Sequence, residues 1–414
     1  PDWSIDYGLS RLDTDGTNIS RTGDEDDESD LLTASLGGKL QATDALSLNF
    51  GSRYVDSTSQ FDPIDFFVTG LPTDGDQSTD NKQLYLQTGA RLANPDSNLA
   101  HNFSARFFET RNTNLSNGTQ DASTKSDRTT LAWQTDIQLG PDVLAIAAEH
   151  ERTTFDQRGE ATPFGDPNQS QAITTNSAIL DWQVRQSDDV TLLLSGRYDD
   201  NSDFDDAFTG RVSFAWEADR NTKLRMSLGT GQKTPTFTER FGFFPDQFIG
   251  NPDLEPEEST AFDAGIERLF LDQSLELQLT YFKQDLENEI NGFALDPGSF
   301  IPTAVNIEGE STRKGIEVET RYAPTSSLEL AASYTYTDST SEDEQGIDSR
   351  EIRRPKHTGS VQANYRFMTG RGNLNLVADY GGTQTDTFFP PFPQPPETVK
   401  LGSYWLVDLT AGFD

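Results

Sequence analysis

Apolar and polar residues alternate along about eighteen segments of this sequence, and the alternation predicts an all-β fold, an antiparallel transmembrane β-barrel. In such a strand one face meets an apolar medium and the other meets water. Short and long connections follow one another in turn, which is typical of barrels that cross a membrane. The longest apolar run, residues 143–148, is far below the ~20 residues that a spanning helix needs.

The strands are predicted from the alternating segments in chain order. They lie near residues 2–12, 30–41, 46–57, 81–92, 98–111, 127–139, 143–155, 174–185, 190–198, 207–217, 222–233, 260–270, 274–290, 303–322, 328–339, 353–367, 373–384 and 402–413. The long connections are expected at 13–29, 58–80, 112–126, 156–173, 199–206, 234–259, 291–302, 340–352 and 385–400. The remaining eight connections are short turns, and almost no helix is expected.

Residues 223–270 show the unit that repeats along the chain. Leu224, Met226 and Leu228 alternate with polar residues and predict a strand with one apolar face. Prolines then remove backbone donors and predict a long loop. A second alternating segment returns from Thr260. Trp182 and Trp216 lie a few residues from short turns, where an interfacial aromatic girdle would sit.

Composition narrows the class of protein. The hydrophobic fraction of 33% is low, but only every second residue of a spanning strand faces lipid. With 68 acidic against 32 basic residues, the net charge of −36 argues against nucleic acid as a partner. The absence of cysteine excludes disulfides and thiolate metal sites. The chain has no starting Met or signal peptide and ends within a strand-like run, so we expect a fragment, one partial barrel domain over residues 1–414.

Four motifs, in the same order, resemble the barrel of TonB-dependent outer-membrane receptors. They are T-P-T-F at 234–237 with G-N-P-D-L-E-P-E at 250–257, A-V-N-I-E-G at 304–309 with R-K-G-I-E-V-E at 313–319, R-R-P-K-H at 353–357, and Y-W-L-V-D-L at 404–409. Within the family, residues 197–202 and the following strand look most like the vitamin B12 receptor and related siderophore receptors.

The resemblance implies a multi-pass protein of the Gram-negative outer membrane. It would take up a scarce metal chelate, cobalamin or a ferric siderophore, with energy from TonB. Barrels of this family have twenty-two strands around a plug. Eighteen strands therefore imply that the first two and the last two are missing, so that the first and last remaining strands have exposed edges. The plug and its TonB box are absent here, so contact with TonB would pass through that missing part. The expected partners are the chelate, TonB and outer-membrane lipid, and the expected state is a monomer.

Aromatic residues on proline-bearing loops are the candidate ligand contacts, because they can grip a flat amphipathic chelate. Loops that pack on one another would need the same residues, and that alternative stays open. The candidates are Phe241, Phe243, Phe244 and Phe248 in the central loop and Phe388, Phe389 and Phe392 in F-F-P-P-F-P-Q-P-P.

Clustered carboxylates suggest Ca²⁺, since this hard cation takes six to eight oxygen ligands. The resemblance places the acidic loop at 24–30 where the B12 receptor holds calcium, with Asp24, Asp26 and Asp27 as candidate ligands. A second acidic run lies at 199–206. A solvated acidic loop is the alternative. No cofactor is otherwise required.

Catalysis has little support, because His101, His150 and His357 are scattered and form no catalytic motif. Two rival functions remain. A passive porin would have a constricting loop folded inward, and a hydrolase barrel would have a Ser–His pair on adjacent lipid-facing strands. If the long loops share one mouth, Asp26 and Phe389 lie at the same end of the barrel.

Overall fold

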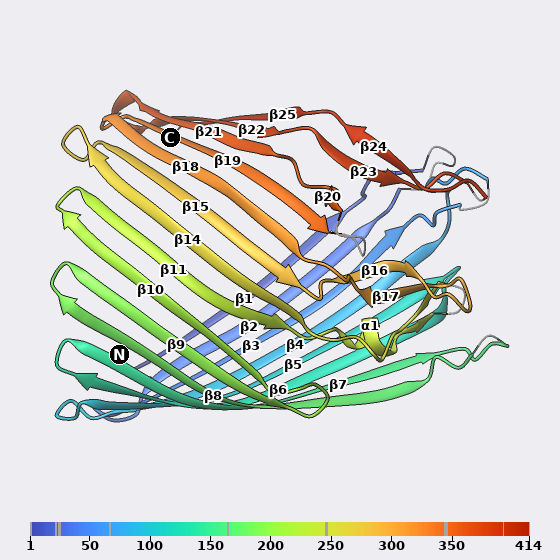
Figure 1. The fold of residues 1–414 in the computed structure, drawn as a ribbon, viewed down its shortest axis with the longest axis horizontal. Coiled ribbons are helices and arrows are strands. Elements are labelled where there is room, and N and C mark those ends of the chain that lie inside the picture. The colour runs from blue at the N-terminus through green and yellow to red at the C-terminus, as the bar shows by residue number, and fades with distance from the viewer. Residues whose placement is uncertain are drawn as a thin grey trace.

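The computed structural model describes residues 2–20, 23, 26–65, 68–163, 165–244, 247–342, 347–391 and 393–413, with all their side chains except that of Phe293. One antiparallel sheet of nineteen strands dominates, and its strands follow chain order (Figure 1). Its eighteen long strands are β1 (Trp3–Thr14), β2 (Ser29–Gln41), β3 (Leu46–Phe61), β4 (Gln77–Ala93), β5 (Leu99–Ser116), β6 (Thr119–Leu139), β7 (Asp142–Gly159), β8 (Gln169–Ser187), β9 (Val190–Asn201), β10 (Ala207–Asp219), β11 (Thr222–Lys233), β14 (Glu257–Phe270), β15 (Leu275–Glu287), β18 (Ser311–Thr325), β19 (Leu328–Glu342), β21 (His357–Phe367), β22 (Gly372–Gly381) and β25 (Tyr404–Phe413).

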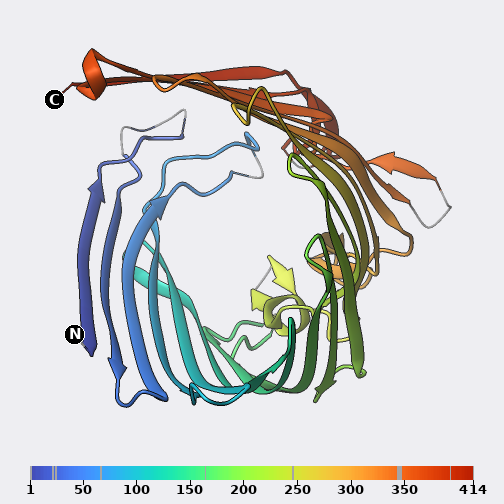
Figure 2. The same cartoon turned by 90° about the vertical axis from the view of Figure 1, so that its left-hand side faces the viewer.

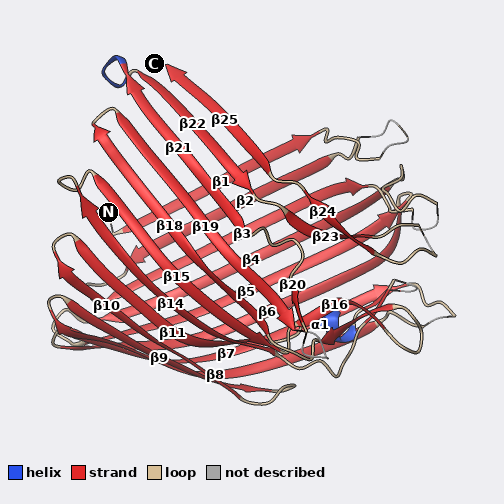
Figure 3. Cartoon of the chain, turned by 45° about the horizontal axis from the view of Figure 1, so that its top comes forward, coloured by secondary structure: helices blue, strands red, loops and turns tan. Residues whose placement is uncertain are grey.

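The remaining elements are short and lie mostly in the connections (Figure 3). They are β20 (Asp348–Arg350), which pairs with the end of β19, α1 (Phe237–Phe241), η1 (Met368–Gly370), β12 (Phe243–Phe244), β13 (Phe248–Ile249), β16 (Ile290–Leu295), β17 (Pro302–Asn306), β23 (Gln384–Phe388) and β24 (Glu397–Leu401). The prediction of eighteen strands with almost no helix is therefore confirmed. In the part of the chain that the structure describes, no helix has the length and apolar character to span a membrane.

The sheet curves around a lumen without closing (Figure 2). Among the described residues β1 pairs only with β2, and β25 pairs only with β22, so both outer edges are unpaired, as predicted. The two halves approach through their loops instead. A Cβ atom on Gly70, between β3 and β4, would lie 2.7 Å from the backbone oxygen of Phe389.

Register separates the two faces of the sheet. Directly opposed residues share a face, so Leu131, His150 and Asn176 form one row and Thr130, Glu151 and Thr175 form the next row on the other face. Apolar residues dominate the first face. Phe103 and Leu131 are each 51% exposed there, an exposure that suits lipid rather than water. The second face lines the lumen.

One predicted loop is wrong. The connection expected at 112–126 is a tight turn at Asn117 and Gly118, whose φ angles are 50° and 70°. These values suit a type I′ hairpin turn, for which Asn-Gly is the strongest sequence signal. Consequently β5 and β6 run on for 18 and 21 residues, beyond the 9–11 that a spanning strand needs. Short and long connections therefore do not alternate strictly.

The predicted strand at 303–322 is also wrong, because it is two strands. The chain turns at Gly309, and β17 leaves the main sheet to pair with β16 and β13. Only β18 continues in the barrel wall. The alternating pattern in this segment is local, and it carries no information about which strand is the partner.

Candidate ligand-binding mouth and lumen

The long connections lie at one end of the barrel and the short turns at the other (Figure 1). β1 and β22 are the first and seventeenth long strands, so both run toward the loop end. Asp26 follows β1 and Phe389 follows β22 by way of β23. The predicted clustering of these residues at one mouth is therefore confirmed.

Residues 234–256 form a lumen loop, which we define as the described part of this stretch, without 245–246. The loop folds inside the ring of strands and carries α1 (Figure 2). The ring of Phe237 stacks on Phe155 of β7, with centroids 5.5 Å apart and planes 5° apart. Phe155 shares the lumen face with Glu151, and it is 5% exposed. An aromatic pair of this kind adds about 0.5–1.5 kcal/mol to simple burial.

Gln157 fastens the next part of the lumen loop. Its Nε2 donates to the backbone oxygen of Phe243 at 2.7 Å, and its Oε1 accepts from the Phe243 N–H at 3.1 Å. Gln169 of β8 donates to Gln157 Oε1 at 3.0 Å and also to the backbone oxygen of Phe241. Gln157 is fully buried. This reciprocal amide pairing satisfies loop backbone groups that would otherwise lose water without compensation.

Sequence reasoning missed α1 and its anchors. Thr236 and Glu239 form a capping box, in which each side chain bonds the other residue's backbone N–H, at 3.2 Å and 2.7 Å. The T-F-T-E spacing at 236–239 is a signal that could have found this turn of helix. No local sequence feature marks Phe155 or Gln157 as an anchor. The partner of Gln157, for example, lies 86 residues further along the chain.

Arg240 of α1 is buried between two rings. Its guanidinium carbon lies 4.6 Å from the centroids of both Phe204 and Phe241. Nη1 lies 3.6 Å from an Asp203 carboxylate oxygen, and Nη2 donates to the Pro252 backbone oxygen at 3.3 Å. Arg240 thus joins the acidic β9–β10 connection to the lumen loop.

The G-N-P-D-L-E-P-E motif is a clamp that holds the end of the lumen loop. Asn251 Nδ2 donates to the Ala304 backbone oxygen at 3.0 Å. Asn306 accepts from the Glu255 N–H and donates to the Glu255 oxygen, each at 2.9 Å. Leu254 is 3% exposed beneath them. The motif therefore positions the loop, and the Asn251 side chain is engaged by protein.

The predicted aromatic residues divide into two groups. Phe241, Phe243, Phe244 and Phe248 lie in the lumen loop and are half-buried, with Phe241 on Arg240. Phe388 and Phe389 are 38% and 50% exposed at the opposite part of the mouth. Phe392 lies outside the described residues.

The predicted calcium ligands are only partly described, since Asp24 lies outside the described residues. Asp26 Oδ1 accepts from the Asn18 N–H at 3.2 Å. Asn18 Oδ1 and Asp27 Oδ2 are buried and have no hydrogen-bond partner in the described part of the chain. Within that part, no three His, Asp or Glu side chains gather into a metal-binding group.

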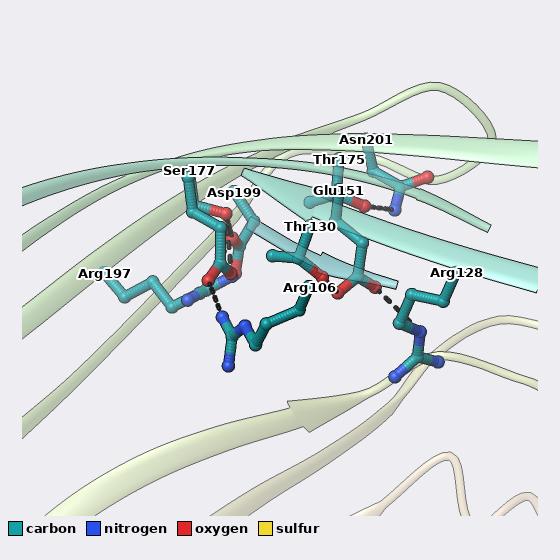
Figure 4. Close-up of polar contacts among 10 residues, drawn as sticks. Arg106, Arg128, Thr130, Glu151, Thr175, Ser177, Arg197, Asp199 and Asn201 are labelled. Carbon is teal, nitrogen blue, oxygen red and sulfur yellow. Dashed lines mark hydrogen bonds and ion pairs between the residues drawn. The ribbon is translucent and has the colours of Figure 1, made fainter. Parts of the chain in front are cut away.

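Below the lumen loop, arginines and carboxylates alternate across the lumen wall (Figure 4). Arg197 of β9 contacts Asp199 at 2.8 Å, Ser177 at 2.7 Å and Glu149 at 3.3 Å. Arg106 of β5 contacts the other oxygen of Glu149 at 3.0 Å.

A second group of the same kind lies alongside. Arg128 contacts Glu151 at 3.3 Å, and Thr130 donates to the other Glu151 oxygen at 3.2 Å. The charges are balanced, and the Arg128 and Arg106 side chains are 56% and 45% exposed toward the lumen. Such a wall is wettable, and it can face either water or the polar surface of another protein domain.

A half-buried ionic group supports the mouth near β18. Arg313 contacts Glu351 at 2.8 Å and Glu289 at 2.7 Å. Burial acts to raise the pKa of the Glu351 carboxyl, but hydrogen bonds from Arg313 and Ser339 outweigh it and hold that pKa below its usual range. Glu351 is thus anionic at neutral pH and ties the connection before β21 to the barrel.

The three histidines do not form a hydrolytic site. His101 bonds Thr135, His150 bonds Asn176 and His357 bonds Tyr334, each at 2.8 Å on the outward face. Within the described residues no histidine hydrogen bond goes to a serine, which leaves the hydrolase alternative without its required pair.

Comparison with known proteins decides the family. The family described as "TonB dependent receptor-like, beta-barrel" matches residues 2–414. The chain belongs to the TonB-dependent receptor family. Members of this family are receptors and transporters of the Gram-negative outer membrane, which is therefore the location of this β-barrel.

Individual relatives and solved structures agree with this family assignment. The chain is 27% identical over 331 residues to the vitamin B12 transporter BtuB of Photobacterium profundum, which covers 78% of this chain and 50% of that protein. The chain thus spans about half the length of that relative. In fold it is similar to the siderophore receptor PirA from Acinetobacter baumannii, with a TM-score of 0.76, 15% identity and coverage of 99% of this chain and 69% of that one. A mutant of the ferric enterobactin receptor PfeA from Pseudomonas aeruginosa gives a TM-score of 0.78, 14% identity and coverage of 100% and 68%.

Proposed function

We propose that this chain is the barrel of a receptor that carries a scarce metal chelate, such as cobalamin or a ferric siderophore, across the outer membrane. The family match over residues 2–414 carries the proposal. The vitamin B12 transporter and siderophore receptors among its relatives support this class of ligand. Energy would come from TonB through a plug-like domain seated against the polar lumen wall, and the receptor would act as a monomer.

The mouth supplies the contacts that such a ligand needs. Phe388 and Phe389 are exposed beside the β3–β4 connection. The lumen loop, which carries the four half-buried phenylalanines, lies inside the ring of strands (Figure 2). Aromatic faces can hold the flat apolar part of a chelate.

Binding to the full-length protein tests this proposal. Cobalamin and a ferric catecholate are titrated separately, before and after Phe389→Ala with Phe388→Ala. Losing buried aromatic contact worth about 1.5–3 kcal/mol should weaken binding of the true ligand about tenfold to a hundredfold. Phe208→Ala is the matched control, because Phe208 is 75% exposed on the outward face of β10. If the double substitution leaves the binding of both chelates unchanged, Phe388 and Phe389 are not part of the ligand site.

A passive porin remains the second candidate, because the lumen loop folds inward as a constricting loop would. The two functions differ in energy use. Uptake that stops in cells lacking TonB supports the receptor. Uptake that continues at the same rate, and rises linearly with solute concentration, supports the porin.

The β1–β2 connection fits Ca²⁺ in one respect. The buried oxygens Asn18 Oδ1 and Asp27 Oδ2 have no hydrogen-bond partner among the described residues, and a bound cation would satisfy them. We infer that Asn18, Asp26 and Asp27 would hold the ion together with Asp24. Calcium should raise the melting temperature of the protein and lose this effect in Asp27→Asn. Asp44→Asn is the control, since Asp44 lies at the opposite end of the barrel.

A further inference from the structure

A shallow groove of about 710 Å³ lies across strands β3 to β8, and most of its side chains belong to the outward face. Small residues form its floor, with Ala90, Ala105 and Ala148 on three different strands. Phe103 and Trp133 rise beside them and are 51% and 41% exposed. Register places Ala90, Phe103, Trp133 and Ala148 in one row directly across the sheet. The groove is therefore an apolar depression on the surface that faces lipid.

The loop-side end of the groove is polar. His150 and Asn176 are directly opposed on β7 and β8, and His150 Nδ1 lies 2.8 Å from Asn176 Oδ1. An amide oxygen can only accept, so Nδ1 carries the proton and the amide group of Asn176 keeps its donors for another partner. Both residues are exposed. Exposed polar groups such as this pair are unfavourable in the apolar belt of a barrel unless they bind a polar partner.

Arg152 is the next outward residue on β7 after His150, opposed to Thr129 and Thr174. It is exposed and makes no hydrogen bond or ion pair within the described part of the chain. Asp127, an outward carboxylate on the neighbouring strand, is engaged by Thr154 at 2.6 Å and Lys125 at 3.4 Å. A free guanidinium thus stands over the polar end of the groove in a chain of net charge −36.

The height of Arg152 matches a lipid head group. It lies ten residues along β7 from Asp142, which follows a short turn. At ~3.3 Å per residue and a tilt of 35–45°, this puts Arg152 roughly 25 Å above the turns. The apolar band of such barrels is also about 25 Å tall. Arg152 therefore lies at the head-group level of the leaflet on the loop side.

We propose that the outward face of β4 to β8 is a binding site for one bilayer lipid whose phosphate head group carries a net negative charge. An acyl chain lies on the alanine floor of the groove and packs against the sides of Phe103 and Trp133. The phosphate binds the Arg152 guanidinium, for which a planar two-pronged donor is well suited. Asn176, oriented by His150, donates a further hydrogen bond. The proposal rests on the outer-membrane location, and it is independent of chelate uptake.

Lipid retention by the full-length protein tests the site. The protein is reconstituted in vesicles containing equal parts of phosphatidylglycerol and phosphatidylcholine, extracted in mild detergent, and examined by native mass spectrometry. We expect one retained phosphatidylglycerol per protein. Arg152→Gln should lower its retention about tenfold or more, as expected for a lost charge-assisted hydrogen bond. Ala148→Phe, which fills the floor, should lower it as well. Lys314→Gln is the control, because Lys314 is exposed on the outward face of β18.

Each other result counts against the site. Equal retention of the two lipids would show that the charge of the head group is not recognised. Retention of phosphatidylglycerol that is unchanged in Arg152→Gln would show that Arg152 does not bind the head group. Displacement of the lipid by inorganic phosphate alone would show an ion site without a chain. Every variant must keep the heat-dependent gel shift of a folded barrel, and chelate binding unchanged in Arg152→Gln separates this proposal from the uptake function.

Discussion

Replacing Gln157 with Leu should release the lumen loop without unfolding the barrel. Gln157 makes two hydrogen bonds to the backbone of Phe243, at 2.7 and 3.1 Å, from a fully buried position. Leu offers neither donor nor acceptor, so the Phe243 N–H and C=O lose their partners. Each unsatisfied group costs about 1–3 kcal/mol, and we take about 3 kcal/mol for the pair because an opened loop regains water. The stacked pair of Phe155 and Phe237 remains.

The effect is measured by hydrogen exchange of the amides in residues 237–244 of the full-length protein. At 1.4 kcal/mol per factor of ten, a loss of about 3 kcal/mol speeds their exchange about a hundredfold. Exchange in the paired strands should not change. Gln134→Leu is the matched control, because Gln134 also faces the lumen but its side chain, within the described residues, bonds only Asp136, at 2.6 Å. Exchange of 237–244 altered less than threefold by Gln157→Leu would refute Gln157 as the anchor.

Three further changes test other parts of the structure. Thr236→Ala removes the capping box of α1 and should cost about 1 kcal/mol, seen as roughly fivefold faster exchange in α1 with no change in Thr238→Ala. Gly315→Ala places a Cβ 1.9 Å from the Tyr336 backbone oxygen and should cost about 1–3 kcal/mol in thermal unfolding, whereas Gly292→Ala meets nothing within 4 Å and should be neutral. Glu351→Gln should lower stability at neutral pH. The pKa of Glu351 is depressed in the folded protein, so its charge adds to the free energy of unfolding above the unfolded pKa of about 4.3. This contribution is lost as the pH falls through the folded pKa. The melting temperatures of the parent protein and of Glu351→Gln should therefore converge in that acidic range. A difference that stays constant with pH would contradict the ionic role.

Several motif residues have structural reasons that a sequence cannot display. Gly315, in the R-K-G motif, allows the close approach of β19. Asn251 and Asn306, in the two central motifs, are fully engaged in tying the lumen loop to β17. The resemblance through these motifs indicated the family correctly, although the residues themselves serve the fold. The predicted ligand contacts, Phe388 and Phe389 among them, stay predictions.

The sequence by itself determined the strands, their faces and the end at which each loop lies. The reason is that alternation is local: every second residue meets the same medium, and the order of strands in a meander follows chain order. The outward face of Leu224, Met226 and Leu228 could therefore be read directly. The strands on either side of the Asn117–Gly118 turn were cut short in the prediction because their outer ends are polar on both faces, where alternation carries no signal.

Only the tertiary structure decided where the lumen loop goes. Its inward course depends on Phe155 and Gln157, two residues on the lumen face of β7 that look like any other alternating positions. Their partners lie on α1 and β12, far along the chain, and meet them because the sheet curves. The close approach of Gly70 to Phe389 and the groove beneath Arg152 arise from the same cause. Curvature is a property of the whole sheet, so no local pattern specifies it.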